Sequence, residues 1–396
     1  MIREGENYAY TVASKRHKGT PLKGKYRTFL KEDYKMDRKV IVVLNNNFSG
    51  SYCSNQYFYT EICHALNILR KRYITVRNLD EATEAFESND VAFSLCLGRY
   101  EYYADKTPLY EKYGILNYQW ISDDPMKFSI DHDSRYIKYI FIDREFPKMA
   151  GTLKNIPLIL PLGYLPEKAR NNTADRINGI LFPGQIRDLG KIKSEIDCSL
   201  LRNQIQAFIE TYDLDSSYIS AYNNAVSAIK ISERKEFFRL TNSYIRTIKR
   251  IKAIEAIHSV PVFIAGEQTD NVFRNPNIVF IGKYDYSQIE EIMGRYRFLL
   301  NVDPNYHSCI HERISRGVNA GALVFSNESQ IVSPINNFYC TYKFDGKKTV
   351  DSVINDENFS ISSELENERA FISETSWLRS LERIIYDNEL YRSRLS

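Results

Sequence analysis

NVDPNYHSCIHERISRGVNAGALVFS, at residues 301–326, has the order strand, loop, helix, glycine, strand. The first apolar run breaks at Asp303, a helix is predicted from about residue 311 to residue 319, and Gly321 precedes a second β-rich run. This order is a βαβ unit, which predicts parallel strands and a ligand site at the carboxyl end of the first strand.

The loop and the first helical turn of this unit carry more polar side chains than a plain turn requires. Backbone amides at a helix start attract anions, and arginines beside them strengthen a phosphate site. The pattern therefore predicts that a phosphate-bearing ligand binds here. The polar side chains are those of His307, His311, Glu312, Arg313, Ser315 and Arg316.

His307, Cys309 and His311 also form an H-x-C-x-H pattern that is compatible with metal binding. Three alternating ligands in one short loop leave tetrahedral zinc without its fourth ligand. We therefore expect no metal at this loop.

Length and composition describe an ordinary two-domain protein. The chain has 396 residues, 43% of them hydrophobic and 26% charged, which is enough for two cores. The net charge of +3 argues against a dedicated nucleic-acid-binding protein. The 29 tyrosines would suit a sugar-binding surface, although drift in composition explains them equally well.

The six cysteines contain no CxxC pair, and the amino terminus has no apolar signal segment. Both features predict a cytoplasmic protein with reduced thiols. Residues 1–37 are polar and basic, so we expect a solvated arm. An alternative is weak attachment to the inner face of an anionic membrane.

Residues 38–166 have the alternating strands and helices of an α/β domain. An apolar run at 39–44 leads into a small-residue loop and a helix at about 55–72, but there is no GxGxxG motif. The loop residues Asn47, Ser49, Gly50 and Ser51 are candidates to contact an acceptor, or Gly50 serves only the turn. Further strands are predicted at 74–76, 91–95, 115–121, 139–143 and 156–161.

Residues 177–375 repeat the pattern after a linker rich in proline and polar residues. A strand at 178–184 ends in a glycine turn, helices follow at about 191–257 with a break near 212–222, and strands are expected at 260–266 and 277–282. Residues 376–396 have helical spacing and are expected to pack back on the N-terminal domain.

Several short motifs of the second half together resemble the donor domain of GT-B glycosyltransferases, of the group 1 (GT4-like) and CgeB-type kinds. The resemblance implies an α/β fold with two Rossmann-like domains facing a cleft. It also implies metal-independent transfer from a nucleotide sugar, with no other cofactor, to a glycan, lipid-linked or protein acceptor, and no nucleic-acid partner. The motifs are FPGQIR at 182–187, FIAG at 263–266, NIVFIG at 277–282, Asp303-Pro304 and AGALV at 320–324, and residues 117–125 resemble the first domain of CgeB-type proteins.

The resemblance also implies a set of donor-binding positions. The group 1 signature has two glutamates, whose positions hold Ser308 and Arg316 in this chain. Glu312 is in register with neither, and we expect it to take over a ribose or sugar contact and a catalytic role. The candidate donor-binding residues are Gly184, Gln185, Arg187, Lys191, Gly266, His307, His311, Arg313 and Arg316.

Two aspartate motifs in the first half remain open. Asp123 and Asp124 follow a predicted strand, where an acid/base group would reach an acceptor, or they simply form an Asp-Pro turn. Asp131 and Asp133 have the D-x-D spacing of metal-dependent transferases, which gives one alternative function. The other is a non-catalytic nucleotide- or carbohydrate-binding protein of the same fold.

Overall fold

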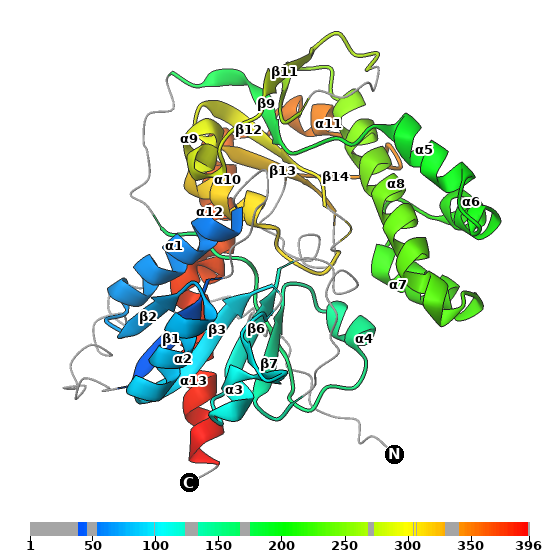
Figure 1. Ribbon diagram of the computed structural model, residues 1–396. Coiled ribbons are helices and arrows are strands. Elements are labelled where there is room, and N and C mark those ends of the chain that lie inside the picture. The colour runs from blue at the N-terminus through cyan, green and yellow to red at the C-terminus, as the bar shows by residue number, and fades with distance from the viewer. Residues whose placement is uncertain are drawn as a thin grey trace. The chain divides into compact units, whose positions relative to one another are not determined.

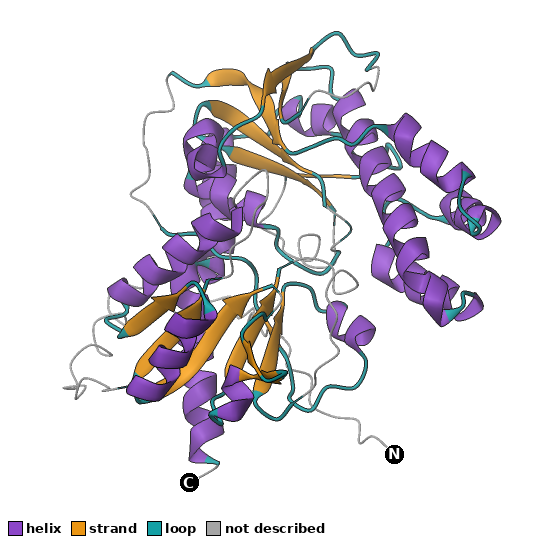
Figure 2. Cartoon of the chain, in the orientation of Figure 1, coloured by secondary structure: helices purple, strands orange, loops and turns teal. Residues whose placement is uncertain are grey.

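The computed structural model describes residues 39–45, 54–98, 100–122, 134–166, 175–267, 273–303, 305, 307–328 and 340–394. Within these ranges the chain forms two six-stranded parallel sheets (Figures 1 and 2). Figure 2 shows each sheet as a separate group of strands with helices packed beside it. The predicted α/β class with two Rossmann-like halves is confirmed.

The first sheet has the strand order β2-β1-β3-β6-β7-β8. The five residues of its interior strand β1 are all buried, because helices cover both faces of such a parallel sheet. Its strands are β1 (Val40–Leu44), β2 (Tyr73–Val76), β3 (Val91–Leu97), β6 (Asn117–Ile121), β7 (Ile137–Phe141) and β8 (Leu158–Ile159). The connections hold α1 (Ser54–Ile68), α2 (Leu79–Ser88), α3 (Leu109–Lys112), α4 (Phe146–Ala150) and the antiparallel pair β4 (Tyr103–Ala104) and β5 (Thr107–Pro108).

The second sheet has the strand order β11-β10-β9-β12-β13-β14, and its pairs are parallel. The chain runs from β9 to one edge and then resumes at β12 on the other side of β9. The carboxyl ends of β9 and β12 therefore form a topological switch point, where ligands bind in open α/β sheets. The strands are β9 (Ile177–Pro183), β10 (Val262–Ala265), β11 (Ile278–Gly282), β12 (Tyr296–Asn301), β13 (Leu323–Asn327) and β14 (Thr341–Tyr342).

The region between β9 and β10 is helical, as predicted, and its break near residues 212–222 is confirmed. These helices form a group of their own beside the second sheet (Figure 1). They are α5 (Leu189–Asp197), α6 (Arg202–Thr211), α7 (Tyr218–Ala225) and α8 (Arg234–Glu255). The other helices are α9 (Ile289–Met293), α10 (Glu312–Asn319), α11 (Val350–Ile354), α12 (Ile361–Ile372) and α13 (Trp377–Ser393).

Helix α13 lies against elements of the first half and contacts α1. The rings of Trp377 and Trp120 meet edge to face at 5.2 Å. A Cβ on Gly163 would lie 2.6 Å from the Trp377 ring, so only glycine fits there. Farther along the helix, the Asp387 carboxylate accepts a hydrogen bond from the Tyr118 hydroxyl at 2.7 Å.

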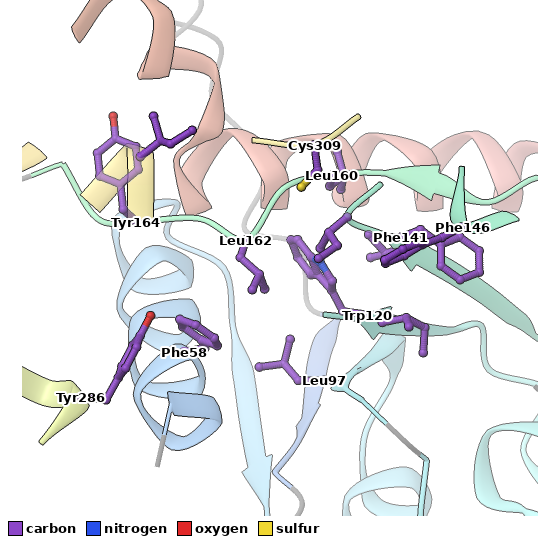
Figure 3. Packing of buried hydrophobic residues seen from close by; sticks show 14 of the residues in the cluster. Phe58, Leu97, Trp120, Phe141, Phe146, Leu160, Leu162, Tyr164, Tyr286 and Cys309 are labelled. Carbon is purple, nitrogen blue, oxygen red and sulfur yellow. The ribbon is translucent and has the colours of Figure 1, made fainter. Parts of the chain in front are cut away.

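Buried apolar residues of both sheets form one continuous cluster. Figure 3 shows part of it, where Tyr286 and Cys309 of the second half lie among Phe58, Leu160 and other residues of the first half. The rings of Phe58 and Tyr286 meet edge to face at 5.5 Å. Burial of this apolar surface stabilises the packing of the two halves. No helix among the described residues is long and apolar enough to span a membrane.

Candidate functional site

Two of the predicted glycines meet at the carboxyl end of the second sheet. The Gly184 amide donates to the Ala265 carbonyl oxygen at 3.1 Å. A Cβ on Gly266 would lie 2.6 Å from the Gly184 carbonyl oxygen, so this position cannot carry a side chain without a shift of backbone. The two turns therefore present bare backbone beside the switch point between β9 and β12.

Helix α10 begins at this switch point, and His311 is its N-cap. His311 Nδ1 lies 2.7 Å from a Glu312 carboxylate oxygen and 3.2 Å from the Arg313 amide nitrogen. Nδ1 cannot serve both groups, because it carries either a proton or a lone pair. Nε2 lies 3.3 Å from Arg313 Nη2, which can only donate. We therefore assign a neutral ring whose Nδ1–H donates to Glu312 and whose Nε2 accepts from Arg313.

The ionisation states follow from this packing. Burial lowers the pKa of His311, and the neighbouring Arg313 guanidinium lowers it further. Burial alone would raise the pKa of Glu312, but the His311 ring and then the Arg313 guanidinium outweigh it and lower that pKa to about 2. At neutral pH the site therefore presents a carboxylate, a neutral imidazole and a guanidinium.

Arg313 is buried, yet the hydrogen bonds of its Nη1 are long. Its Nη1 lies 3.4 Å from both the Asn301 side-chain oxygen and the Val302 carbonyl oxygen. Burial lowers the pKa of Arg313, Glu312 opposes this effect, and the like charge of Arg246 adds to it. The guanidinium lies 6.0 Å from the centre of the Phe182 ring.

Helix α8 supplies two further arginines that the sequence analysis did not select. Arg246 and Arg250 share one face of the helix, because they are four residues apart. The Arg250 guanidinium lies 5.7 Å from the centre of the Phe182 ring, which is also near Arg313. Arg250 also donates a hydrogen bond to the Gln185 carbonyl oxygen. Arg246 lies close enough to lower the pKa of both His311 and Arg313. Its Nε is buried without a hydrogen-bond partner in the part of the chain that the structure describes.

We call Arg246, Arg250 and Arg313 the arginine cluster. It places like charges together at the N-terminus of a helix, where the partial charge is also positive. The spacing of Arg246 and Arg250 was visible in the sequence, but nothing there indicated that α8 faces α10.

The structure brings two other predicted residues to the arginine cluster. Arg187 Nη1 donates to Ser243 Oγ at 2.7 Å, and Ser243 precedes Arg246 by three residues on α8. Gln185 lies in the same loop as Arg187 and is held by Arg250. By contrast, Lys191 lies on α5, where its side chain is 77% exposed and its ammonium nitrogen lies 3.6 Å from the Asp188 carboxylate. No contact in the described residues links Lys191 to α10.

Arg316 is placed differently from our prediction. Its side chain has no exposed surface and pairs with Glu61 of α1 and with Glu290 of α9, the latter at 2.8 Å. Its guanidinium also lies near the rings of Tyr57, at 5.2 Å, and of Tyr286, at 5.9 Å. A side chain enclosed in this way is not accessible to a donor, so we remove Arg316 from the candidate donor site.

Ser308, at a position where the resemblance expects a glutamate, points to the first half of the chain. Its hydroxyl and its amide donate to the Asp143 carboxylate at 2.5 and 2.9 Å. Asp143 is fully buried just after β7. Burial raises the pKa of Asp143 to about 6, although the Ser308 and Glu145 hydrogen bonds oppose this rise.

Several predicted positions lie outside the described residues. They are Asn47, Ser49, Gly50, Ser51, Asp123, Asp124, Asp131 and Asp133. Within the described ranges, no group of three or more His, Cys, Asp or Glu side chains is arranged to hold a metal ion.

No protein-family model matches the chain, and no curated protein sequence matches it. Solved structures do match. Sucrose-phosphate synthase from Thermosynechococcus elongatus has a TM-score of 0.50 and 9% identity, with 90% of this chain and 99% of that chain covered. AviGT4, a glycosyltransferase involved in avilamycin A biosynthesis, has a TM-score of 0.49 and 9% identity, covering 89% of this chain and 97% of its own. A DNA-modifying β-glucosyltransferase has a TM-score of 0.49 and 12% identity, covering 88% and 99%.

Identities this low carry information on the fold and not on the reaction. The fold that the match to sucrose-phosphate synthase supports is the predicted one, with two Rossmann-like sheets in one chain. The chain therefore has the GT-B fold.

Proposed function

We propose that the protein is a glycosyltransferase that binds a nucleotide sugar with its diphosphate against the arginine cluster. The observation that carries this proposal is the like charge of Arg246 and Arg313 at the buried N-terminus of α10. Arg313 is buried and Arg246 is half-buried, and Glu312 balances only one of these two charges. The remaining positive charge costs free energy unless a counter-ion is bound. A diphosphate would supply that counter-charge and would accept hydrogen bonds from the guanidinium groups.

The proposed arrangement also suits the chemistry of glycosyl transfer. Negative charge builds on the leaving diphosphate as the bond to the sugar breaks, so groups placed to meet that charge lower the barrier. Arginines and helix amides can do this without a metal ion. The Gly184 and Gly266 turns pack backbone against backbone at this end of the sheet. Ionised Glu312 is available to accept a hydroxyl of the ribose or the sugar.

The acceptor is part of the proposal as well. We keep the first half as the acceptor-binding half and the acceptor as a glycan, a lipid-linked molecule or a protein. Asp123 and Asp124 directly follow the residues of β6 and remain candidates for contacts to that acceptor. The group 1 and CgeB-type resemblance supports this assignment.

Donor binding can be tested by thermal unfolding with UDP-, GDP-, ADP- and CMP-sugars. A ligand of the native state raises the melting temperature by mass action. We expect one donor class to stabilise the wild-type protein and to stabilise Arg313→Gln much less. Arg202→Gln is the matched control, because Arg202 is exposed on α6 and pairs with Asp197 at 3.3 Å. If no donor raises the wild-type melting temperature, the proposed function fails.

Release of nucleoside diphosphate by the stabilising donor would then separate an enzyme from a non-catalytic binding protein. Turnover that persists in EDTA is the expected result. Turnover that EDTA abolishes would favour a metal-dependent transferase using Asp131 and Asp133.

A further inference from the structure

The loop between β12 and α10 is fastened to elements on both sides. Asn305 Nδ2 donates to the Asn242 side-chain oxygen of α8 at 2.7 Å, while Ser308 is held by Asp143 of the first half. Asn305 is 1% exposed and has a φ of 75°, a left-handed conformation that an asparagine adopts at some cost. His307 lies between these two anchors, so its position is fixed by contacts to both halves of the chain.

The His307 ring is enclosed but has unused hydrogen-bonding capacity. Its side chain is 12% exposed, and Nδ1 lies 3.9 Å from an Asp303 carboxylate oxygen, which is beyond a hydrogen bond. Nδ1 is buried and makes no hydrogen bond within the part of the chain that the structure describes. A buried polar group without a partner requires an explanation, and a missing ligand is one.

Burial keeps the His307 ring neutral against most of the charges that face it. Burial lowers the pKa of His307, Asp303 opposes this effect and Lys249 of α8 adds to it. Glu145 and Asp215, which precede α4 and α7, also raise the pKa, but the net shift is downward from 6.5. At neutral pH the ring therefore has one nitrogen with a lone pair, as a proton acceptor requires.

The neighbouring carboxylates in this region are occupied by hydrogen bonds. Glu145 accepts from the Ser217 hydroxyl at 2.5 Å and from the Ser220 hydroxyl at 2.7 Å, at the start of α7. Asp143 accepts from Ser308 and from the Glu145 amide. His307 differs from Glu145 and Asp143 in that its buried Nδ1 makes no hydrogen bond among the described residues.

We propose that His307 is the general base that takes the proton from the acceptor hydroxyl, with Asp303 as its positioning partner. The proposal rests on the proposed function. His307 precedes the N-cap His311 by four residues, so the base and the diphosphate site lie on one anchored loop. The negative charge of Asp303 would stabilise the imidazolium that forms during the reaction.

In the proposed step, the acceptor oxygen bonds to the anomeric carbon while the bond from that carbon to the diphosphate oxygen breaks. The acceptor proton moves to His307 Nε2, and the bonding electron pair leaves with the diphosphate. The arginine cluster stabilises the charge on this leaving group. A single displacement of this kind inverts the configuration of the anomeric carbon.

The test follows hydrolysis of the nucleotide sugar that stabilises the protein most, with water as the acceptor, between pH 5 and pH 9. For the wild type we expect the rate to fall on the acid side, at a pH below the ordinary histidine pKa of 6.5, because burial lowers the pKa of His307 and the ring becomes protonated only there. His307→Gln should lose about 10²- to 10⁴-fold in rate and lose this pH dependence, with its donor affinity unchanged. Asp303→Asn should lose a smaller fraction of the rate than His307→Gln. The acid side of its pH–rate profile should move to lower pH, because Asp303 raises the pKa of His307 in the wild type.

His258→Gln is the matched control, since His258 is an exposed histidine next to β10. The Asp303→Asn pH shift supports the proposal even where His307→Gln folds poorly. Three results would contradict the assignment of His307 as the general base. They are an unchanged rate and pH profile in His307→Gln, a sugar product of retained configuration, and donor binding by the wild type without any turnover. Complete loss of turnover in Asp124→Asn with near-normal turnover in His307→Gln would transfer the role to Asp124. If the wild-type protein binds no donor, that result contradicts the proposed function instead.

Discussion

Arg313 and Arg316 lie one turn apart on α10, and both are buried, yet their surroundings differ in charge. Arg316 has two carboxylates, Glu61 and Glu290, together with the Gly163 carbonyl oxygen. Arg313 has Glu312 on one side and the like charge of Arg246 on the other. A buried cation with matched charges stabilises the fold, whereas one held beside another cation indicates a site for an anion. The difference separates a structural arginine from a ligand-binding one within a single helix.

The first prediction concerns the buried ion pair of Arg316 and Glu61, and its expected effect is the largest. Glu61 also accepts a hydrogen bond from the Trp377 indole nitrogen at 2.8 Å, so Arg316 and Glu61 connect α10, α1 and α13. Arg316→Gln leaves the Glu61 charge buried without its cation, which should cost about 3–5 kcal/mol in the free energy of unfolding. Denaturant unfolding measures this change.

The control is the double variant Glu61→Gln/Arg316→Gln, which removes both charges and should recover part of the loss. A loss below about 1 kcal/mol in the single variant would mean that the pair is not desolvated as the structure indicates.

The second prediction concerns the pH dependence of stability that Asp143 causes. Asp143 holds the loop before α10 through its hydrogen bonds with Ser308. The folded pKa of about 6 lies above the ordinary value of 3.8. The stabilising contribution of the protonated carboxyl is therefore complete below pH 3.8 and is lost as the pH rises to about 6. A shift of this size corresponds to about 3 kcal/mol.

Asp143→Asn keeps an acceptor for Ser308 but does not titrate. Between pH 4 and pH 6 the wild type should lose up to about 3 kcal/mol of unfolding free energy relative to this variant. Unfolding curves at pH 4, 5, 6 and 7 measure the difference, and a difference that stays constant with pH would contradict the assigned burial of the carboxylate.

The third prediction concerns Arg313 itself. Arg313→Gln should weaken binding of the donor's nucleoside diphosphate by about 10- to 100-fold, because a hydrogen bond to a charged group contributes about 1.5–3 kcal/mol. Its effect on the unfolding free energy should be smaller than that of Arg316→Gln. Arg313→Lys keeps the charge but not the planar fork, so we expect an intermediate affinity by calorimetry. Equal affinities of wild type and Arg313→Gln would exclude this residue from the site.

The sequence was most informative where local pattern determines structure. The βαβ unit at 301–326 was predicted because apolar strands, a breaking Asp-Pro and a closing glycine lie within one short segment. The helix start at His311 followed from the same pattern, and His311 is the N-cap of α10 in the structure.

The sequence was least informative about charge partners that tertiary packing supplies. Arg316 resembled a donor contact because it follows a polar helix start, but its partner Glu61 is 255 residues away in the chain. Arg246 and Arg250 resembled ordinary cations of a long helix until α8 was placed against α10. Lys191 follows a glycine turn at the expected distance, yet α5 directs it to solvent. No local property of these residues distinguishes the three outcomes.

Arg246 gives the most direct test of the central claim that α10 begins at an anion site. Melting temperatures of wild type and Arg246→Gln should be measured without ligand and with the nucleoside diphosphate of the preferred donor. Relief of like-charge repulsion predicts that the ligand-free variant is at least as stable as the wild type, while its ligand-induced increase in melting temperature is much smaller. A variant that is destabilised without ligand and shows the full wild-type increase with ligand would contradict the claim.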